Sequence, residues 1–246
     1  MSAGAGLSAR GRYGWLDLAR GIALIAMAVY HFVWDLSLFG LVRPETPFEP
    51  HWRYLARATA GSFLFLSGIS LAIAHSGGIR WMPYLRRLAM ILGAAGVITA
   101  LTLYATPEQF IFFGILHMIA VGSVAGLVLV RLPWWLTVMV AIAVAWLGLF
   151  YQSALFDRPS LWWTGLGTFS VPSSDLVPFF PSFTAVAFGI AAAKLFDLRG
   201  GSTLSGSSGR ASRALRWAGR HSLFVYLVHQ PILIGLLYAY VWLASL

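Results

Sequence analysis

The first long apolar run of this chain reads Asp17-Leu-Ala-Arg-Gly-Ile-Ala-Leu-Ile-Ala-Met-Ala-Val-Tyr-His-Phe-Val-Trp-Asp35. Between its two acidic ends it holds only two ionisable groups near neutral pH, Arg20 and His31, which predicts a helix that spans a lipid bilayer. Ionisable groups inside such a helix are costly, so we interpret both as functional. Their spacing of eleven residues, at about 100° each, puts both side chains on one face, roughly 17 Å apart along the axis.

Asp35 lies one helical turn beyond His31, where a carboxylate can hold an imidazole nitrogen and fix its tautomer. The alternative is that Arg20 only anchors the helix at the cytoplasmic surface and His31 only bonds to another helix. The sequence leaves both interpretations open.

The composition indicates a membrane protein with several spans. Of 246 residues, 59% are hydrophobic and 10% charged, and eleven are Trp, which is more apolar than a soluble domain requires. The net charge of +9 would suggest nucleic acid as partner of a soluble protein, but here the basic residues fall in loops and no nucleic acid is expected. Because the chain has no Cys, disulfides, thiolate nucleophiles and Cys-based metal sites are excluded, and no metal site is predicted.

Segments long and apolar enough to span predict an all-α, polytopic bundle of about seven transmembrane helices, forming a single domain over residues 1–246. These segments are residues 18–41, 55–75, 84–105, 111–131, 133–151, 177–197 and 221–244. Residues 1–16 are expected to form a flexible cytoplasmic N-terminus. Residues 198–215, rich in Gly and Ser, are expected to form a flexible cytoplasmic linker.

The positions of Lys and Arg predict the orientation. With the N-terminus inside, thirteen of these residues lie on the inner side and four, Arg43, Arg53, Arg57 and Arg158, on the outer side. This is the bias expected of cytoplasmic loops. Seven spans would then place the C-terminus outside.

Three further residues in spanning segments are candidates for a pocket shared with His31. His229 and the adjacent Gln230 lie in the last segment, and His117 enters the fourth from its outer side. We predict that they line a substrate pocket. Each alone could instead be an ordinary interhelical hydrogen bonder. A different class of function is also open, a haem-binding electron carrier with His117 and either His229 or His31 as axial ligands.

Basic residues at the inner side form a second candidate site. Arg forks suit phosphate, so a long phosphorylated cofactor could lie with its phosphates at the surface and its reactive end near His31. The proposed cofactor-binding residues are Arg20, Arg86, Arg87, Arg216 and Arg220. The alternative is attraction to anionic lipid alone.

The segment before the second span offers a third candidate site, an acceptor site on the outer side. It contains Glu49, His51 and Trp52. Aromatic faces stack on sugar rings and carboxylates accept hydroxyl or ammonium hydrogen bonds, so the set suits a sugar or an amine. An ordinary aromatic belt with solvated charges is the alternative.

Four runs of sequence, taken together, resemble bacterial members of the heparan-α-glucosaminide N-acetyltransferase catalytic-domain family, within a superfamily of transmembrane acyltransferases. The runs are Leu16-Asp-Leu-Ala-Arg-Gly-Ile-Ala-Leu-Ile-Ala-Met-Ala-Val-Tyr-His-Phe, Phe63-Leu-Phe-Leu-Ser-Gly-Ile-Ser, Gly114-Ile-Leu-His-Met-Ile-Ala and Ala218-Gly-Arg-His-Ser-Leu-Phe-Val-Tyr-Leu-Val-His-Gln-Pro231. The resemblance implies a multi-pass protein of the bacterial inner membrane. It also implies acetyl-CoA bound from the cytoplasmic side and acetyl transfer to an amino or hydroxyl group of a sugar or glycan outside.

Two branches of this superfamily nominate different catalytic residues. The polysaccharide O-acyltransferase branch has an Arg, ten residues and then a His in its first helix, which matches Arg20 and His31. The lysosomal branch has its active His before a Trp in the first luminal loop, which matches His51 and Trp52. We favour His31, oriented by Asp35, as general base or acyl carrier. A non-catalytic carrier or flippase of lipid-linked sugars stays open, as do the oligomeric state and a homodimer.

Overall fold

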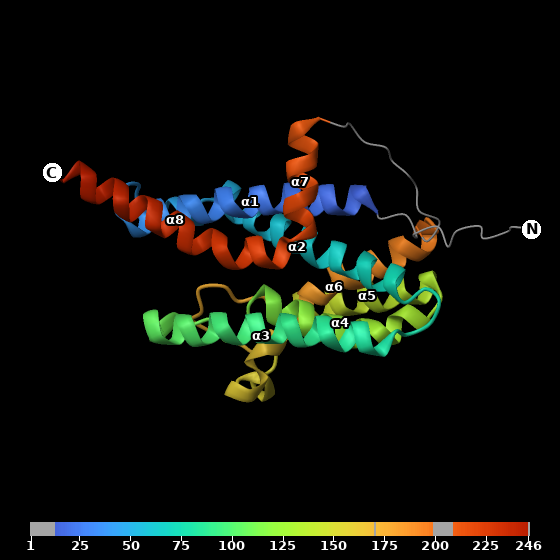
Figure 1. The fold of residues 1–246 in the computed structure, drawn as a ribbon. Coiled ribbons are helices and arrows are strands. Elements are labelled where there is room, and N and C mark those ends of the chain that lie inside the picture. Colours follow the sequence, from blue (N-terminus) through green and yellow to red (C-terminus); the bar gives the residue numbers. More distant parts are fainter. Residues whose placement is uncertain (1–12, 170, 199–208, 246) are drawn as a thin grey trace, which may run out of the picture.

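The computed structural model describes residues 13–169, 171–198 and 209–245 (Figure 1). In these ranges the chain forms eight α-helices, four short 3-10 helices and no strand, which confirms the all-α prediction. The α-helices are α1 (Gly14–Leu38), α2 (Pro50–Ala74), α3 (Trp81–Ala105), α4 (Ile115–Arg131), α5 (Trp134–Phe150), α6 (Phe179–Leu195), α7 (Arg210–Arg220) and α8 (Ser222–Ala244). The 3-10 helices are η1 (Thr46–Phe48), η2 (Pro107–Gln109), η3 (Ala154–Phe156) and η4 (Pro159–Thr164).

Each of the seven apolar segments of the sequence coincides with one of these α-helices, and α1, α2 and α3 begin three to five residues before the predicted segment. Four of them, α1, α2, α3 and α8, are long and apolar enough to cross a membrane. The other three, α4, α5 and α6, are apolar but have 17 residues each. The chain is therefore an all-helical membrane protein, and the number of spans stays a prediction.

The core lies where α2 and α6 cross. At this crossing the carbonyl of Val186 lies against Gly68 and the carbonyl of Phe65 lies against Gly189, so that a Cβ on either glycine would overlap the backbone of the other helix. Small residues permit such close contact of helices in membranes, where dispersion replaces the hydrophobic effect. Buried Leu64, in α2, belongs to the same apolar cluster. α5 covers α6, and α4 packs against both α2 and α6.

One helix, α7, does not correspond to any apolar segment of the sequence. It runs across α1 rather than along it (Figure 1). The two helices meet at another pair of glycines, since a Cβ at Gly21 would overlap the Leu215 carbonyl and one at Gly219 the Asp17 carbonyl. The expectation of a flexible linker is thus wrong for residues 210–215, which are helical because α1 offers them a surface. The expectation of a flexible N-terminus is likewise wrong for residues 14–16, which form the first turn of α1. Residues 199–208 of the linker and residues 1–12 of the N-terminus lie outside the described residues.

The last helix, α8, lies beside the first, α1, and ends on the opposite side of the molecule from the N-terminus (Figure 1). Its first turns also reach α3 and α4, where Leu223, Tyr226 and Leu227 pack on an apolar cluster of those helices. This arrangement brings Gln230 of α8 against Asp35 of α1.

Candidate active site

Two imidazoles meet in the interior between α1 and α8. The ring centroids of His31 and His229 are 5.0 Å apart, in an edge-to-face arrangement. The Nδ1 atom of His229 lies 2.6 Å from the Tyr226 carbonyl oxygen, which can only accept, so Nδ1 carries the hydrogen. The other nitrogen of His229, Nε2, then presents a lone pair; it is buried and has no hydrogen-bond partner among the described residues. This is the protonation pattern that a general base requires.

Asp35 contacts α8 through Gln230. The Gln230 Nε2 atom donates to Asp35 Oδ1 at 2.6 Å, and the Asp35 side chain is fully buried. The sequence predicts that Asp35 orients His31, but the hydrogen bond that the structure describes for this carboxylate goes to Gln230 instead. Asp35 Oδ2 and Gln230 Oε1 are buried without a partner in the described part of the chain. Together with His229 Nε2, they leave three polar atoms available to a polar ligand.

Tyr226 connects the two imidazoles with the predicted phosphate site. Its ring centroid is 5.7 Å from that of His229, one turn away on α8. The same residue lines a small cavity of about 90 Å³ together with Arg20 of α1 and Arg87 of α3. Two guanidinium groups at one cavity provide the donors that a phosphate needs. A cavity of this size suits the end of a chain-like group rather than a whole nucleotide.

The predicted arginine set divides into two groups. Arg20 donates to the Ser70 hydroxyl and lies 3.6 Å from the Asp17 carboxylate. Arg220 pairs with the same carboxylate at 3.8 Å. Arg216 lies beside Gly14 at the start of α1, whereas Arg86 is exposed. Arg20 and Arg87 thus face the interior cavity, and Arg220 and Arg216 surround the start of α1.

Asp175 adds a carboxylate from a loop between η4 and α6. The Ile115 N–H, in the first turn of α4, donates to this carboxylate. Burial raises the pKa of Asp175, and the hydrogen bond from Ile115 opposes that rise. Its charge acts on Tyr226 of α8 and Tyr30 of α1, and its Oδ2 atom lies against Gly114, the N-cap residue of α4.

The side chain of His117 bonds to the backbone at the start of α4. Its Nδ1 accepts from the Gly114 N–H at 3.2 Å, and its Nε2 lies 3.3 Å from the Thr99 hydroxyl. That hydroxyl in turn donates to the Ile111 carbonyl at 2.7 Å. Both ring nitrogens are therefore engaged, and His117 has no nitrogen open for the substrate contact or the axial haem ligation that the sequence suggests.

The outer set forms a contiguous surface group at the start of α2. Glu49 pairs with Arg43 at 3.2 Å and lies 3.8 Å from His51 Nε2. The His51 ring contacts the Trp52 ring at a centroid distance of 5.1 Å. The side chain of His51 is 65% exposed, whereas His31 and His229 are half-buried. The two candidate catalytic histidines, His31 and His51, therefore belong to different groups.

Sequence reasoning missed three residues of this interior. Tyr226 precedes His229 by one turn, a spacing that places both on one face of α8 and could have identified it. Ser70 gives no comparable signal, because its contact with Arg20 depends on how α1 and α2 pack. Asp175, assigned from the sequence to an outer loop, enters the site because that loop is bonded to the segment before α4, with Ser174 N donating to the Gln109 carbonyl at 2.9 Å.

Comparison with known proteins gives a family and no individual relative. No curated protein and no solved structure matches the chain significantly. The family model for heparan-alpha-glucosaminide N-acetyltransferase, catalytic, matches residues 12–231, which include α1 to α7 and α8 as far as the His229–Gln230 pair. The chain therefore belongs to the heparan-alpha-glucosaminide N-acetyltransferase catalytic-domain family, a family of membrane acetyltransferases.

Proposed function

We propose that this protein takes an acetyl group from acetyl-CoA on the cytoplasmic side of a bacterial inner membrane and transfers it to an amino or hydroxyl group of a sugar or glycan outside. The observation that carries the proposal is the continuity of polar groups from Arg20 and Arg87, past Tyr226, to His31 and His229. A path of this kind joins a phosphate-binding end to an acid–base centre.

The inner end suits the phosphate-bearing donor. Arg20 and Arg87 line the cavity, and Arg216 and Arg220 lie around the start of α1. Because the cavity holds only about 90 Å³, the nucleotide would stay at the surface with its phosphates at Arg20 and Arg87, and only the narrow arm of acetyl-CoA would pass through the cavity. The excess of Lys and Arg at this end supports a cytoplasmic N-terminus.

The imidazole pair supplies the proton transfers. The acceptor nitrogen or oxygen bonds to the acetyl carbonyl carbon as its proton passes to an imidazole nitrogen. The carbon–sulfur bond then breaks, and that proton is returned to the leaving sulfur. His31 is the proposed base, and His229, whose Nε2 is held as an acceptor, lies in ring contact with it. The Tyr226 hydroxyl is the proposed donor to the developing oxyanion.

The outer group has a different proposed role. Glu49, His51 and Trp52 are placed to meet the acceptor as it arrives, since they form one accessible patch. His51→Ala should therefore raise the KM for the acceptor with little change in kcat. The reverse result, a dead His51→Ala beside an active His31→Ala, would place the chemistry at the outer patch instead.

The direct test is transfer by purified protein. Labelled acetyl-CoA is supplied with a panel of amino sugars and hydroxyl-only sugars, and both free CoA and acetylated sugar are measured. We expect acetylated sugar from the wild type and none from His31→Ala. If the wild type binds acetyl-CoA but yields neither free CoA nor acetylated sugar with any acceptor, the protein is not an acetyltransferase.

A further inference from the structure

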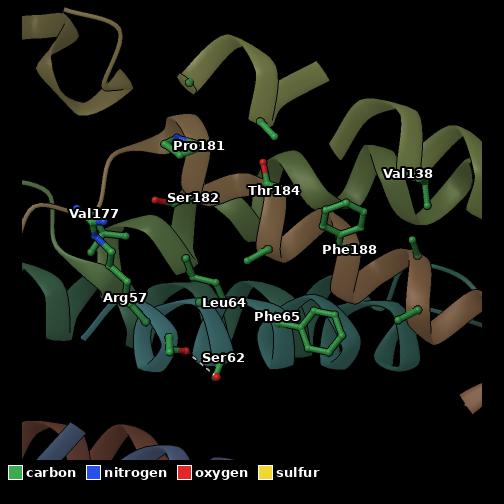
Figure 2. A pocket seen from close by; sticks show the side chains of 18 of the residues that line it. Arg57, Ser62, Leu64, Phe65, Val138, Val177, Pro181, Ser182, Thr184 and Phe188 are labelled. Carbon is green, nitrogen blue, oxygen red and sulfur yellow. Dashed lines mark hydrogen bonds between the residues drawn. The ribbon is translucent and has the colours of Figure 1, made fainter. Parts of the chain in front are cut away.

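A large groove runs along the opposite side of α2 from α1, between α2, α5 and α6. It has a volume of about 1260 Å³ and is mostly apolar (Figure 2). Its floor is built from small residues, among them Gly61, Ala145 and Ala185, which leave the space that larger side chains would fill. In a membrane, such a groove faces lipid.

The groove is longer than one leaflet of a bilayer. Its lining follows α6 from Pro181 to Leu195, which at 1.5 Å per residue is about 20 Å. Half the hydrocarbon core of a bilayer measures about 15 Å. Where α6 crosses the bilayer along its normal, a groove of this length extends beyond the leaflet that holds an ordinary glycerophospholipid chain. It suits a hydrocarbon chain longer than one leaflet.

One end of the groove is cationic. Arg57 lines it within α2, and Figure 2 shows its side chain beside Val177, at the same end as Ser182 and away from Phe188 and Val138. Arg57 makes no hydrogen bond or ion pair with any residue in the described ranges. Arg57 lies toward the outer end of a candidate span, where a bound anionic group would supply a counter-charge. Ser182 adds a hydroxyl at the same end.

We propose that this groove binds a polyisoprenoid phosphate, with its phosphate at Arg57 and Ser182 and its long chain along α6. The guanidinium supplies the charge and the forked donors that a phosphate monoester requires. The apolar wall supplies the contact for the chain. Binding here is independent of acetyl transfer, and it can be measured whether or not the proposed activity is present.

The test is a binding titration of the purified full chain in detergent. The probes are undecaprenyl monophosphate and dioleoyl phosphatidic acid, which are both phosphate monoesters but differ in their hydrocarbon chains. We expect undecaprenyl monophosphate to bind at least about tenfold more tightly. Arg57→Gln should lower that affinity by about tenfold or more, through the loss of a charge-assisted contact.

A second variant tests the groove itself. A Cβ atom added at Gly61 meets no atom within 4 Å. Gly61→Leu should therefore fold normally, with its side chain in the groove. It too should reduce binding by about tenfold. The matched controls are Arg53→Gln, one turn before Arg57 but not in the groove, and Gly93→Leu, on α3 and equally open. Both should bind like the wild type.

Two results would overturn the proposal. Equal affinity for the two probes would mean that the groove takes ordinary bilayer lipid. If Arg57→Gln binds undecaprenyl monophosphate as tightly as the wild type, the phosphate is held elsewhere. Because Arg57 is exposed and has no partner among the described residues, its substitution should not disturb folding, and this test stands even if Gly61→Leu fails to fold.

Discussion

The Gln230 side chain donates at 2.6 Å to the fully buried Asp35 carboxylate, across 195 residues of sequence. It joins the last helix to the first next to the His31–His229 ring contact, so the two helices that carry the proposed chemistry are bonded to each other. Stability and activity can therefore be separated by choosing which of these contacts to change.

Removing one partner of the Asp35–Gln230 bond should destabilise the protein. Asp35→Ala leaves the Gln230 amide buried without an acceptor, at a cost of about 1 to 3 kcal/mol. Asp35→Asn should cost less, because its amide oxygen still accepts. The thermal unfolding midpoint in detergent measures both, and adding Gln230→Leu to Asp35→Ala should recover part of the loss. If all three variants unfold at the same midpoint as the wild type, the bond contributes nothing to stability.

The imidazole pair should behave as one unit in catalysis. His31→Ala and His229→Ala should each reduce kcat by about 10²- to 10⁴-fold, and the double variant should lose little more than either alone. Acetyl transfer by purified protein is the measurement. His221→Ala, at the exposed start of α8, is the matched control and should keep its activity. Multiplicative losses in the double variant would mean that the two rings act separately.

Donor affinity should depend on the arginines of the interior cavity. Arg20→Ala and Arg87→Ala should each weaken CoA binding by roughly tenfold to a hundredfold, the value of a charge-assisted contact of about 1.5 to 3 kcal/mol. Arg80→Ala, whose side chain is outside that cavity, should change it little. Calorimetric titration with CoA checks this. If all three variants lower CoA affinity by the same small factor, Arg20 only anchors its helix at the membrane surface.

Close contact of α7 with α1 should depend on its glycine pair. Gly219→Ala places a methyl group against the backbone of Asp17 and Gly21. Because backbone atoms cannot rotate away as a side chain can, α7 must shift. We expect a lower unfolding midpoint and, because Arg220 moves away from Asp17, weaker CoA binding. Gly93→Ala, with nothing within 4 Å of the added methyl group, should leave both unchanged.

The predicted orientation can be tested with a fusion at the end of the chain. Seven spans with the N-terminus inside place a reporter after Leu246 on the outer side. An alkaline phosphatase fusion should be active there, and a fluorescent fusion that folds only in the cytoplasm should be dark. Cytoplasmic signal would mean that one of the shorter apolar helices, α4, α5 or α6, does not cross.

The sequence by itself determined the seven apolar helices and the class of protein. Hydrophobic runs act locally, since every backbone group in lipid must be bonded within its own segment, so each predicted apolar segment coincides with a helix. It also placed Arg20 and His31 on one face, because helical periodicity is independent of the rest of the chain.

Only the tertiary structure decided which of these residues meet. The partner of Asp35 is Gln230 rather than the nearby His31, and Asp175 comes from a loop bonded to a distant segment. The helix α7 forms where glycines let it approach α1, although its Gly- and Ser-rich surroundings indicate a linker. Such contacts depend on the packing of elements far apart in sequence, and no local pattern encodes them.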